Sequence, residues 1–225
     1  MASPYWPLFD LTVRTSLLTL TYPDDEMLFG LATKTGDLFG SGESQFKLDW
    51  TSEPSPVREL HSLQYWWRVR AEVTPEHFDL PMAVVVDGEA VGIQQLMARS
   101  FARTRSVTTG SWLRRSFQGR GLGKEMRRAI LCLAFDGLGA SEAHSSAFET
   151  NQASLAVSRS LGYEPNGEQV ALRGEVPARS LGFRMTRERF AAIPTGDIEI
   201  AGLEPCLAML GLEPHPPAPG GAGAP

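Results

Sequence analysis

The sequence predicts an α/β protein with a mixed central sheet flanked by helices. The clearest local pattern is MAVVVDGEAVGIQQLMA, residues 82–98, in which two strand-like runs flank Asp87-Gly88. Aspartate and glycine tolerate the left-handed backbone of a tight turn, so these runs predict a β-hairpin. Two further segments, residues 122–139 and 151–162, have the periodicity and the end residues of helices.

Both helices are predicted from the positions of their apolar and capping residues. Residues 151–162 begin at Asn151, a favourable helix cap, and Gly162 follows the last turn. In the other helix, Arg127 and Arg128 are predicted to lie off the apolar face. That face is formed by Met126, Ala129, Ile130 and Leu133.

The remaining elements follow along the chain. Residues 9–22 alternate apolar and polar side chains and predict a strand, broken near Arg14 to Ser16. A helix is expected within residues 22–36, with Asp24 or Asp25 as its cap and Gly36 as its stop. We expect a loop over 36–56, a helix over 57–72, and strands over 105–113, 142–148, 169–173 and 181–187.

Length and composition set limits on the class of protein. A chain of 225 residues suits one domain with a tail, and the segment EPHPPAPGGAGAP is a low-complexity end that cannot pack a core. The net charge of −5 argues against a nucleic-acid-binding protein, which is usually basic. Neither a signal peptide nor an apolar run long enough to span a membrane is visible, so we expect a cytoplasmic protein without a membrane partner.

The cysteine and histidine spacings predict no metal site. Cys132 and Cys206 are far apart, which indicates neither a disulfide framework nor a zinc cluster. The four histidines also lack the spacing of metal ligands: His61, His77, His144 and His215.

Three glycines precede the predicted helix of residues 122–139. In RRSFQGRGLGKEMRRAI they occupy every second position, and Lys124 follows the last of them. The first N–H groups of a helix have no partner within it, and the helix dipole makes that end attractive to anions. Glycines allow the backbone to approach a phosphate closely, so the stretch predicts a phosphate-binding loop, with a plain helix-capping turn as the alternative.

Two well-known phosphate loops are excluded by the spacing. A P-loop requires Gly, four residues and then Gly-Lys followed by Ser or Thr, whereas Gln118 takes the first position here and Glu125 follows the lysine. The dinucleotide pattern G-x-G-x-x-G fails as well, because its last position would be Lys124 or Met126.

The loop and a second segment resemble a known family. Residues 118–123 fit Gln/Arg-x-x-Gly-x-Gly/Ala, and about 28 residues downstream NQASLAVSRSLGY fits an Asn-x-x-Ala/Ser helix that ends in Leu-Gly-Phe/Tyr. Both are motifs of the GCN5-related N-acetyltransferase (GNAT) superfamily, and the chain resembles its RimJ/RimL branch over roughly residues 8–190. The resemblance implies a GNAT domain over 1–190, a C-terminal extension with a disordered tail over 191–225, and splayed central strands that form an acyl-CoA slot.

The acyl donor is left open between acetyl-CoA and succinyl-CoA, with no metal cofactor. The segments YWPLFDLTVRT, LPMAVVVDGEAVGIQQL and GKEMRRAIL are similar to those of a mycobacterial protein succinyltransferase within the branch. Arginines that cluster around the central strands would then hold the acyl carboxylate, with a solvated strand face as the alternative. These are Arg99, Arg103, Arg105, Arg114 and Arg115.

The resemblance also implies a set of cofactor-binding residues. The pyrophosphate would lie on the N–H groups of residues 119–124, Gln118 would close the loop, and the backbone of the preceding strand would pair with the pantetheine amides. The full set is Trp112, Leu113, Gln118, Gly119, Arg120, Gly121, Leu122, Gly123, Lys124, Asn151, Ser154 and Ser158.

Three catalytic roles are expected by the same resemblance. A free N–H at Leu113 would stabilise the oxyanion. Ser158 stands where many members carry a tyrosine that acts as the general acid. Ser154, or a water that it holds, is therefore the expected acid here. Glu149, just before the Asn151 helix, is the expected base, with a plain surface carboxylate as the alternative. The position of a further family glutamate is taken by Asn166, and the nearest carboxylates are Glu164 and Glu168.

The acceptor is expected to be an amine, of a protein N-terminus, a lysine or a small molecule, and the protein is a possible homodimer. Tyr65, Trp66 and Trp67 could line an acceptor groove, although such a cluster on a helix more often forms core and interface. Two other functions stay open: an antibiotic or other small-molecule acetyltransferase, and a regulator that binds acyl-CoA without catalysis.

Overall fold

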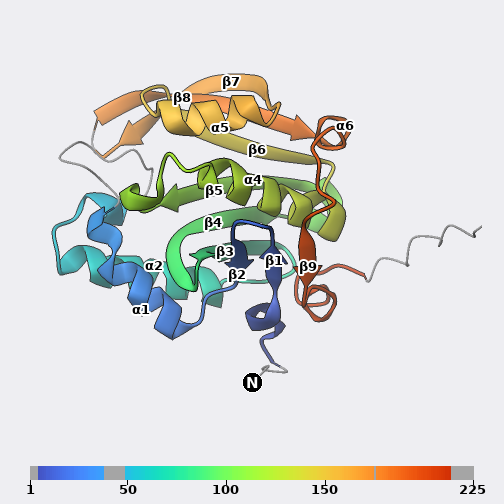
Figure 1. Ribbon diagram of the computed structural model, residues 1–225, viewed down its shortest axis with the longest axis horizontal. Helices are drawn as coiled ribbons and strands as arrows, with labels where there is room; N and C mark the ends of the chain where they lie inside the picture. Colours follow the sequence, from blue (N-terminus) through green and yellow to red (C-terminus); the bar gives the residue numbers. More distant parts are fainter. Residues whose placement is uncertain (1–4, 38–48, 175, 214–225) are drawn as a thin grey trace, which may run out of the picture.

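The computed structural model describes residues 5–37, 49–174 and 176–213. It contains a nine-stranded sheet with the order β7-β8-β6-β5-β4-β3-β2-β1-β9 (Figure 1). Neighbouring strands pair antiparallel except β5 and β6, which are parallel, so the predicted α/β fold with a mixed sheet is confirmed and the sheet is mostly antiparallel. The strands are β1 Thr12–Arg14, β2 Thr19–Thr21, β3 His77–Val86, β4 Glu89–Arg99, β5 Ser106–Leu113, β6 Glu142–Phe148, β7 Glu164–Arg173, β8 Val176–Thr186 and β9 Glu199–Ala201.

Helices cover both faces of the sheet. On one face, α4 and α5 contact each other and pack over the central strands, while α1 and α2 pack on the opposite face (Figure 1). The α-helices are α1 Asp25–Thr33, α2 Val57–Ala71, α3 Phe101–Thr104, α4 Leu122–Cys132, α5 Gln152–Ser160 and α6 Arg187–Phe190, and α4 continues into a π-helical turn, Leu133–Gly137.

The hairpin and the helix caps form as the sequence predicts. Asp87 and Gly88 have φ values of 50° and 79°, as a tight turn between β3 and β4 requires. The Asp24 side chain accepts a hydrogen bond from the Met27 N–H at 2.8 Å, and Asn151 accepts one from the Ser154 N–H at 3.1 Å. These are the contacts of helix N-caps.

The parallel pair β5–β6 separates partway along its length. Pairing runs over four residue pairs, from Ser106↔Glu142 to Thr109↔Ser145. Beyond that point β5 stays paired to β4 as far as Leu113, and β6 stays paired to β8 as far as Phe148. The two strands therefore part at their carboxyl ends, and the unpaired interval between their facing edges is called the slot below.

One side of α4 differs from its prediction. Met126, Ala129 and Ile130 are buried as expected, but Arg127 is also buried, at 3% exposure, so its placement off the buried face is wrong. Its guanidinium donates to serine hydroxyls of β5 and β6, and this tertiary contact overrides the helical pattern.

The packed part of the chain extends past residue 190. Strand β9 pairs with β1, and four side chains after it are buried, so part of the C-terminal extension packs onto the core. Those side chains are Cys206, Leu207, Leu210 and Leu212. The predicted tail falls on residues 214–225, outside the described residues.

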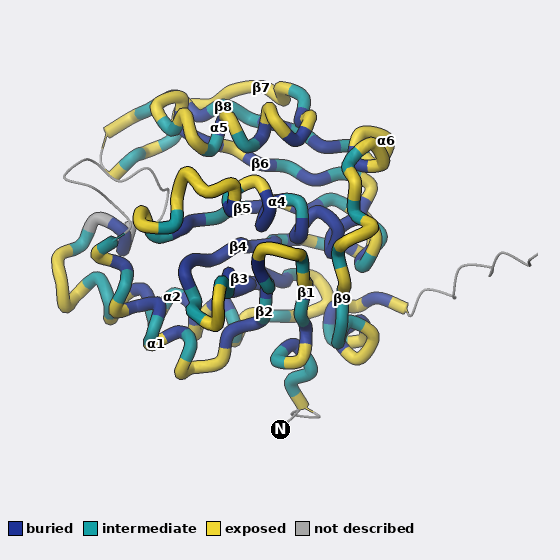
Figure 2. The backbone as a smooth tube through the Cα atoms, viewed as in Figure 1, coloured by how far each residue is buried: buried dark blue, intermediate teal, exposed yellow. Residues whose placement is uncertain are grey.

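The closing strands β7 and β8 are longer than predicted, and β7 forms the exposed edge of the sheet (Figure 2).

Replacing Gly92 by alanine should destabilise the fold by about 1–3 kcal/mol. Gly92 of β4 lies opposite Leu113, and a Cβ there would stand 2.3 Å from the Trp112 carbonyl oxygen. Gly30→Ala in α1 is the control, because its Cβ meets nothing within 4 Å and it should stabilise the protein by about 0.5–1 kcal/mol. Urea unfolding measures both, and equal stability of the Gly92→Ala variant and the parent would contradict this register.

Candidate functional site

The loop before α4 has the open backbone of a phosphate-binding loop. Gly119 and Gly121 have φ values of 74° and 82°, and a Cβ on either would meet no atom within 4 Å. Gly121 is the N-cap of α4, and no side chain caps this helix end. Gly123 differs, because it lies inside the helix and its Cβ would make an ordinary contact with Val157 at 3.6 Å.

The amides of this loop are available to an anion. The N–H groups of Lys124 and Glu125 both donate to the Gly121 carbonyl oxygen at 3.1 Å. Within the described part of the chain, no acceptor takes the five preceding N–H groups, those of residues 119–123. The Gln118 side chain closes the loop by donating to the Leu113 carbonyl oxygen at 2.9 Å.

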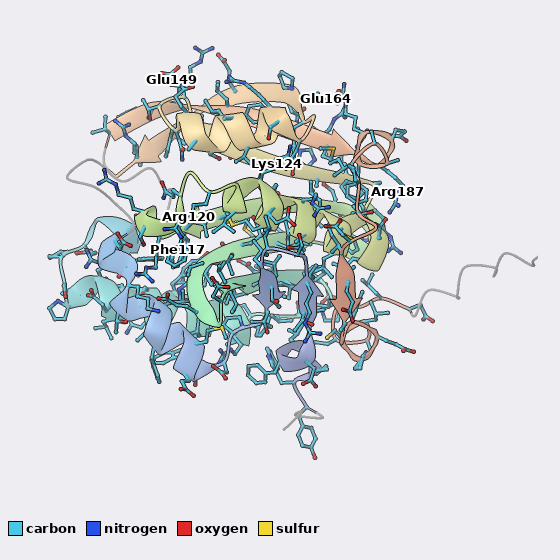
Figure 3. The ribbon with its side chains drawn as sticks, in the orientation of Figure 1. Phe117, Arg120, Lys124, Glu149, Glu164 and Arg187 are labelled. Carbon is cyan, nitrogen blue, oxygen red and sulfur yellow. The ribbon has the colours of Figure 1, made fainter. Side chains whose placement is uncertain are left out.

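Basic side chains surround the loop. The Arg120 guanidinium lies 5.1 Å from the centre of the Phe117 ring, and Figure 3 shows both residues at the start of α4. Lys124 lies on the side of α4 that faces α5 (Figure 3). A cavity of about 570 Å³ opens between these helices, and Lys124 and Arg189 line it together with the end of α5. This end of the site is therefore suited to phosphate groups.

Successive residues of β5 point their backbone N–H and C=O groups alternately toward β4 and toward the slot. The Arg114 N–H donates to the carbonyl oxygen of Val91 in β4 at 2.9 Å, so the backbone groups of Arg114 face β4. In an antiparallel ladder the next residues along the strand turn their N–H and C=O groups to the other side. The N–H groups of Leu113 and Ser111 thus face the slot, and the Gln118 contact with the Leu113 carbonyl agrees with this direction. Ser111 was not among the residues expected from the sequence.

Helix α5 borders the slot from the β6 side. Asn151 caps it, and the next turn carries Ser154, which is partly buried. Ser158 is buried at 1% exposure and faces the protein interior. Of the three, Asn151 and Ser154 lie in the first turn of α5, close in the chain to the unpaired end of β6.

Glu149 follows the last residue of β6, but it is turned toward β8. Its N–H donates to the Arg179 carbonyl oxygen at 3.0 Å, and its carboxylate lies 3.6 Å from the Arg179 guanidinium. Figure 3 shows it on the β7–β8 side of the molecule, away from Arg120. The other two glutamates considered are also paired: Glu168 with Arg179, and Glu164 with Arg184 and Arg189. Hydrogen bonds from Arg184 lower the pKa of Glu164.

The expected arginine cluster does not form. Arg105 precedes β5 and Arg114 follows it, and eight extended residues separate them by more than about 25 Å. Arg114 is moreover paired with Glu89 and Asp37. The distance along the strand excludes a carboxylate pocket that all five arginines share, because side chains at opposite ends of a strand cannot reach one anion.

The aromatic cluster of α2 divides between core and surface. Trp66 is 3% exposed and packs with Trp50 and Trp112, whereas Trp67 is 39% exposed and donates to Asp25. Tyr65 lines a cavity of about 520 Å³ on the α2 face of the sheet.

That cavity contains a buried carboxyl group that sequence reasoning missed. Asp79 of β3 is 9% exposed, and Gln95 donates to its Oδ2 at 2.6 Å and to the Tyr65 hydroxyl at 3.0 Å. No partner for its Oδ1 exists among the described residues. Burial raises the pKa of Asp79 to about 7, with a smaller contribution from the charge of Glu72. The only signal in the sequence is one aspartate between Phe78 and Leu80 in an otherwise apolar strand.

Two kinds of feature are absent from the residues that the structure describes. No helix among them is long and apolar enough to span a bilayer. They also contain no cluster of three or more His, Cys, Asp or Glu side chains arranged to hold a metal ion.

A nine-stranded mixed sheet with a glycine loop at a helix start and a slot between splayed parallel strands defines an acyltransferase-like α/β fold. The acetyltransferase (GNAT) domain family matches residues 38–164. This match covers more than half of the chain, and the protein belongs to the GNAT acetyltransferase family.

Solved structures share this fold at low sequence identity. RimJ of Mycobacterium smegmatis, in complex with CoA-disulfide, is 19% identical with a TM-score of 0.67, over 84% of this chain and 94% of that one. RimL, a ribosomal alpha-N-protein acetyltransferase in complex with coenzyme A, is 17% identical with a TM-score of 0.63, over 76% and 95%. The microcin C7 self-immunity acetyltransferase MccE, in complex with acetyl-CoA and AMP, is 14% identical with a TM-score of 0.64, over 76% and 93%.

Replacing Asp79 by asparagine should stabilise the protein more at pH 8 than at pH 4. The raised pKa means that the folded state keeps a proton which the unfolded chain has released above about pH 4. The stability linked to the neutral carboxyl is complete below that pH and is lost as pH rises through about 7.

The advantage of the Asp79→Asn variant should therefore grow by about 1–3 kcal/mol between the two pH values. Chemical denaturation of both proteins at each pH measures it. A constant difference would mean that the carboxyl does not titrate abnormally.

Proposed function

We propose that this protein is an acyl-CoA-dependent N-acyltransferase that moves an acetyl or succinyl group from CoA to a primary amine in a ternary complex. One observation carries the proposal: the free N–H groups of the glycine loop and those of Ser111 and Leu113 border one continuous path from α4 into the slot. The GNAT match and the CoA complexes named for RimJ and RimL support the same donor.

The donor would bind along this path in three parts. Its pyrophosphate would accept hydrogen bonds from the N–H groups of residues 119–124, and Arg120 would add charge. The pantetheine arm would reach the thioester position at the free end of β5, where the N–H of Leu113 or Ser111 is available, with Asn151 and Ser154 on the other side. The nucleotide end would then lie near the basic cavity that contains Lys124.

The chain's own groups would assist a direct acyl transfer. The lone pair of the amine attacks the thioester carbonyl carbon, a C–N bond forms, and the C–S bond then breaks. The N–H of Leu113, or that of Ser111, would stabilise the oxyanion. Ser154, or a water that it holds, would return a proton to the thiolate. Glu149, whose carboxylate is turned toward Arg179, would receive the proton that the amine loses only through water.

The acceptor would approach from the face that α2 covers. The cavity there contains Asp79 and Glu72, whose carboxyl groups favour a cationic amine. RimL is named as an alpha-N-acetyltransferase of a ribosomal protein, which supports a protein N-terminus as the acceptor, with a lysine as the alternative. The volume of about 520 Å³ is also suited to a small molecule, so a small-molecule amine acetyltransferase is the second candidate.

Replacing Gly121 by alanine should weaken CoA binding at least about tenfold, because a methyl group would occupy the position that a phosphate takes. Gly167→Ala is a matched control: its φ is 77°, its Cβ also meets nothing within 4 Å, and it lies on the edge strand β7. Both variants should lose about 1 kcal/mol of stability through backbone strain.

Calorimetric titration with CoA, beside a melting curve, separates the two effects. Only the Gly121 variant should lose affinity. A parent protein that binds neither CoA nor acetyl-CoA would refute the proposed function, and equal affinities of the two variants would show that the glycine serves only the turn.

The proposed acid and base can be tested by kinetics. Ser154→Ala and Glu149→Gln should each lower kcat on the order of 100-fold with the KM for acyl-CoA little changed, because proton transfer acts after binding. The measurement is the pH–rate profile of CoA release with a panel of amines. If the acidic limb of the pH–rate profile is unchanged in the Glu149→Gln variant, Glu149 is not the base, and water or Asp79 takes that role.

A further inference from the structure

Arg127 occupies an unusual place for a charged side chain. It is 3% exposed beneath α4, and its guanidinium bridges the two splayed strands. Nη1 donates to Ser145 Oγ of β6 at 2.9 Å, and Nη2 donates to Ser111 Oγ of β5 at 3.3 Å. Both partners are neutral hydroxyls, so the positive charge is not neutralised by them.

This bridge lies at the closed end of the slot. Ser145 belongs to the last residue pair of β5 and β6, Thr109↔Ser145, and Ser111 lies two residues beyond that pair. A group that enters the slot as far as the strands permit therefore reaches the guanidinium.

Two polar atoms at this point have no partner. Over the residues that the structure describes, neither Arg127 Nε nor Gln94 Oε1 has a hydrogen-bond partner, and both are buried. Gln94 lies directly opposite Ser111 in the β4–β5 register. Buried donors and charges without partners cost free energy, so such a cluster is expected where a polar ligand or water completes it.

The next residue of α4, Arg128, is by contrast neutralised by carboxylates. Arg128 forms ion pairs with Glu125 at 2.8 Å and Asp197 at 2.6 Å. In the described ranges 5–37, 49–174 and 176–213, Arg127 has no such carboxylate. An uncompensated buried charge is strongly unfavourable, so an anion that reached this guanidinium would be bound favourably.

The length of the slot limits which anion fits. Along β5, Ser111 and Leu113 are separated by about 6.6 Å, the rise of two extended residues. A thioester carbonyl held by the Leu113 N–H would place the far carboxylate of a four-carbon dicarboxylic acyl group within hydrogen-bond reach of the bridge. A two-carbon acetyl group would leave the guanidinium without an anion.

We propose that Arg127, with Ser111 and Ser145, is a carboxylate-binding site that selects a dicarboxylic acyl group such as succinyl. This inference rests on the proposed acyltransferase function and names its donor. Arg127 replaces, as the selecting residue, the five arginines that the sequence suggested. A charged, hydrogen-bonded carboxylate in a water-poor slot favours one donor over its neutral analogue by more than a surface contact would.

The test compares donors that differ only in the carboxylate. Succinyl-CoA and butyryl-CoA both carry a four-carbon acyl chain, and calorimetry gives their dissociation constants without any acceptor. The parent should bind succinyl-CoA on the order of ten- to a hundredfold more tightly than butyryl-CoA. Arg127→Met should abolish or invert this ratio and leave the affinity for free CoA unchanged. Arg103→Met, an exposed residue of α3, should keep the parent ratio.

The outcomes separate this inference from the proposed function. If the parent binds free CoA but prefers butyryl-CoA or binds both equally, the carboxylate site is refuted and the acyltransferase proposal stands. A parent that binds no CoA compound refutes the proposed function itself. If Arg127→Met does not fold, the parent ratio alone decides, because it needs no variant.

Discussion

The separation of β5 from β6 after Thr109↔Ser145 is the constraint on which the rest of the site depends. Backbone N–H and C=O groups inside a protein require partners, and the strands remain fully paired on their outer sides. The inner edge of β5 is thus left to be completed by something other than protein. Because α4 and α5 both follow the carboxyl ends of these strands, their N-termini meet at the open end of the same slot. The end of the β5–β6 pairing therefore brings together the free edge of β5, the glycine loop before α4 and the capped start of α5 (Figure 1).

Charge divides the molecule into two functional faces despite a net charge of −5. Arg120 and Lys124 lie on the side that α4 covers, which suits a polyanionic donor. The opposite face carries the buried carboxyl of Asp79, which suits a cationic amine. Only the single layer of the β-sheet separates these two faces. An acyl group in the slot is therefore within reach of groups on either face.

Local features of this site could be predicted from sequence, and long-range ones could not. The glycine loop, the Asn151 cap and the Asp87-Gly88 hairpin depend on residues adjacent in the chain, and they form as predicted. Arg127 was placed off the apolar face because a helical pattern does not reveal Ser111 and Ser145, which lie 16 and 18 residues away on two strands. Asp79 was missed for the same reason, since Gln95 and Tyr65 reach it from other elements. The arginine cluster was wrong because closeness in sequence is lost along an extended strand.

The central claim is that coenzyme A completes the free backbone edge, and amide hydrogen exchange tests it most directly. Exchange measured by mass spectrometry with and without saturating CoA reports on the N–H groups themselves. We expect slower exchange in peptides that cover residues 110–124 and the start of α5, with β7 unaffected. Unchanged exchange over residues 110–124 in a protein that binds CoA would mean that the ligand lies elsewhere and would contradict the claim.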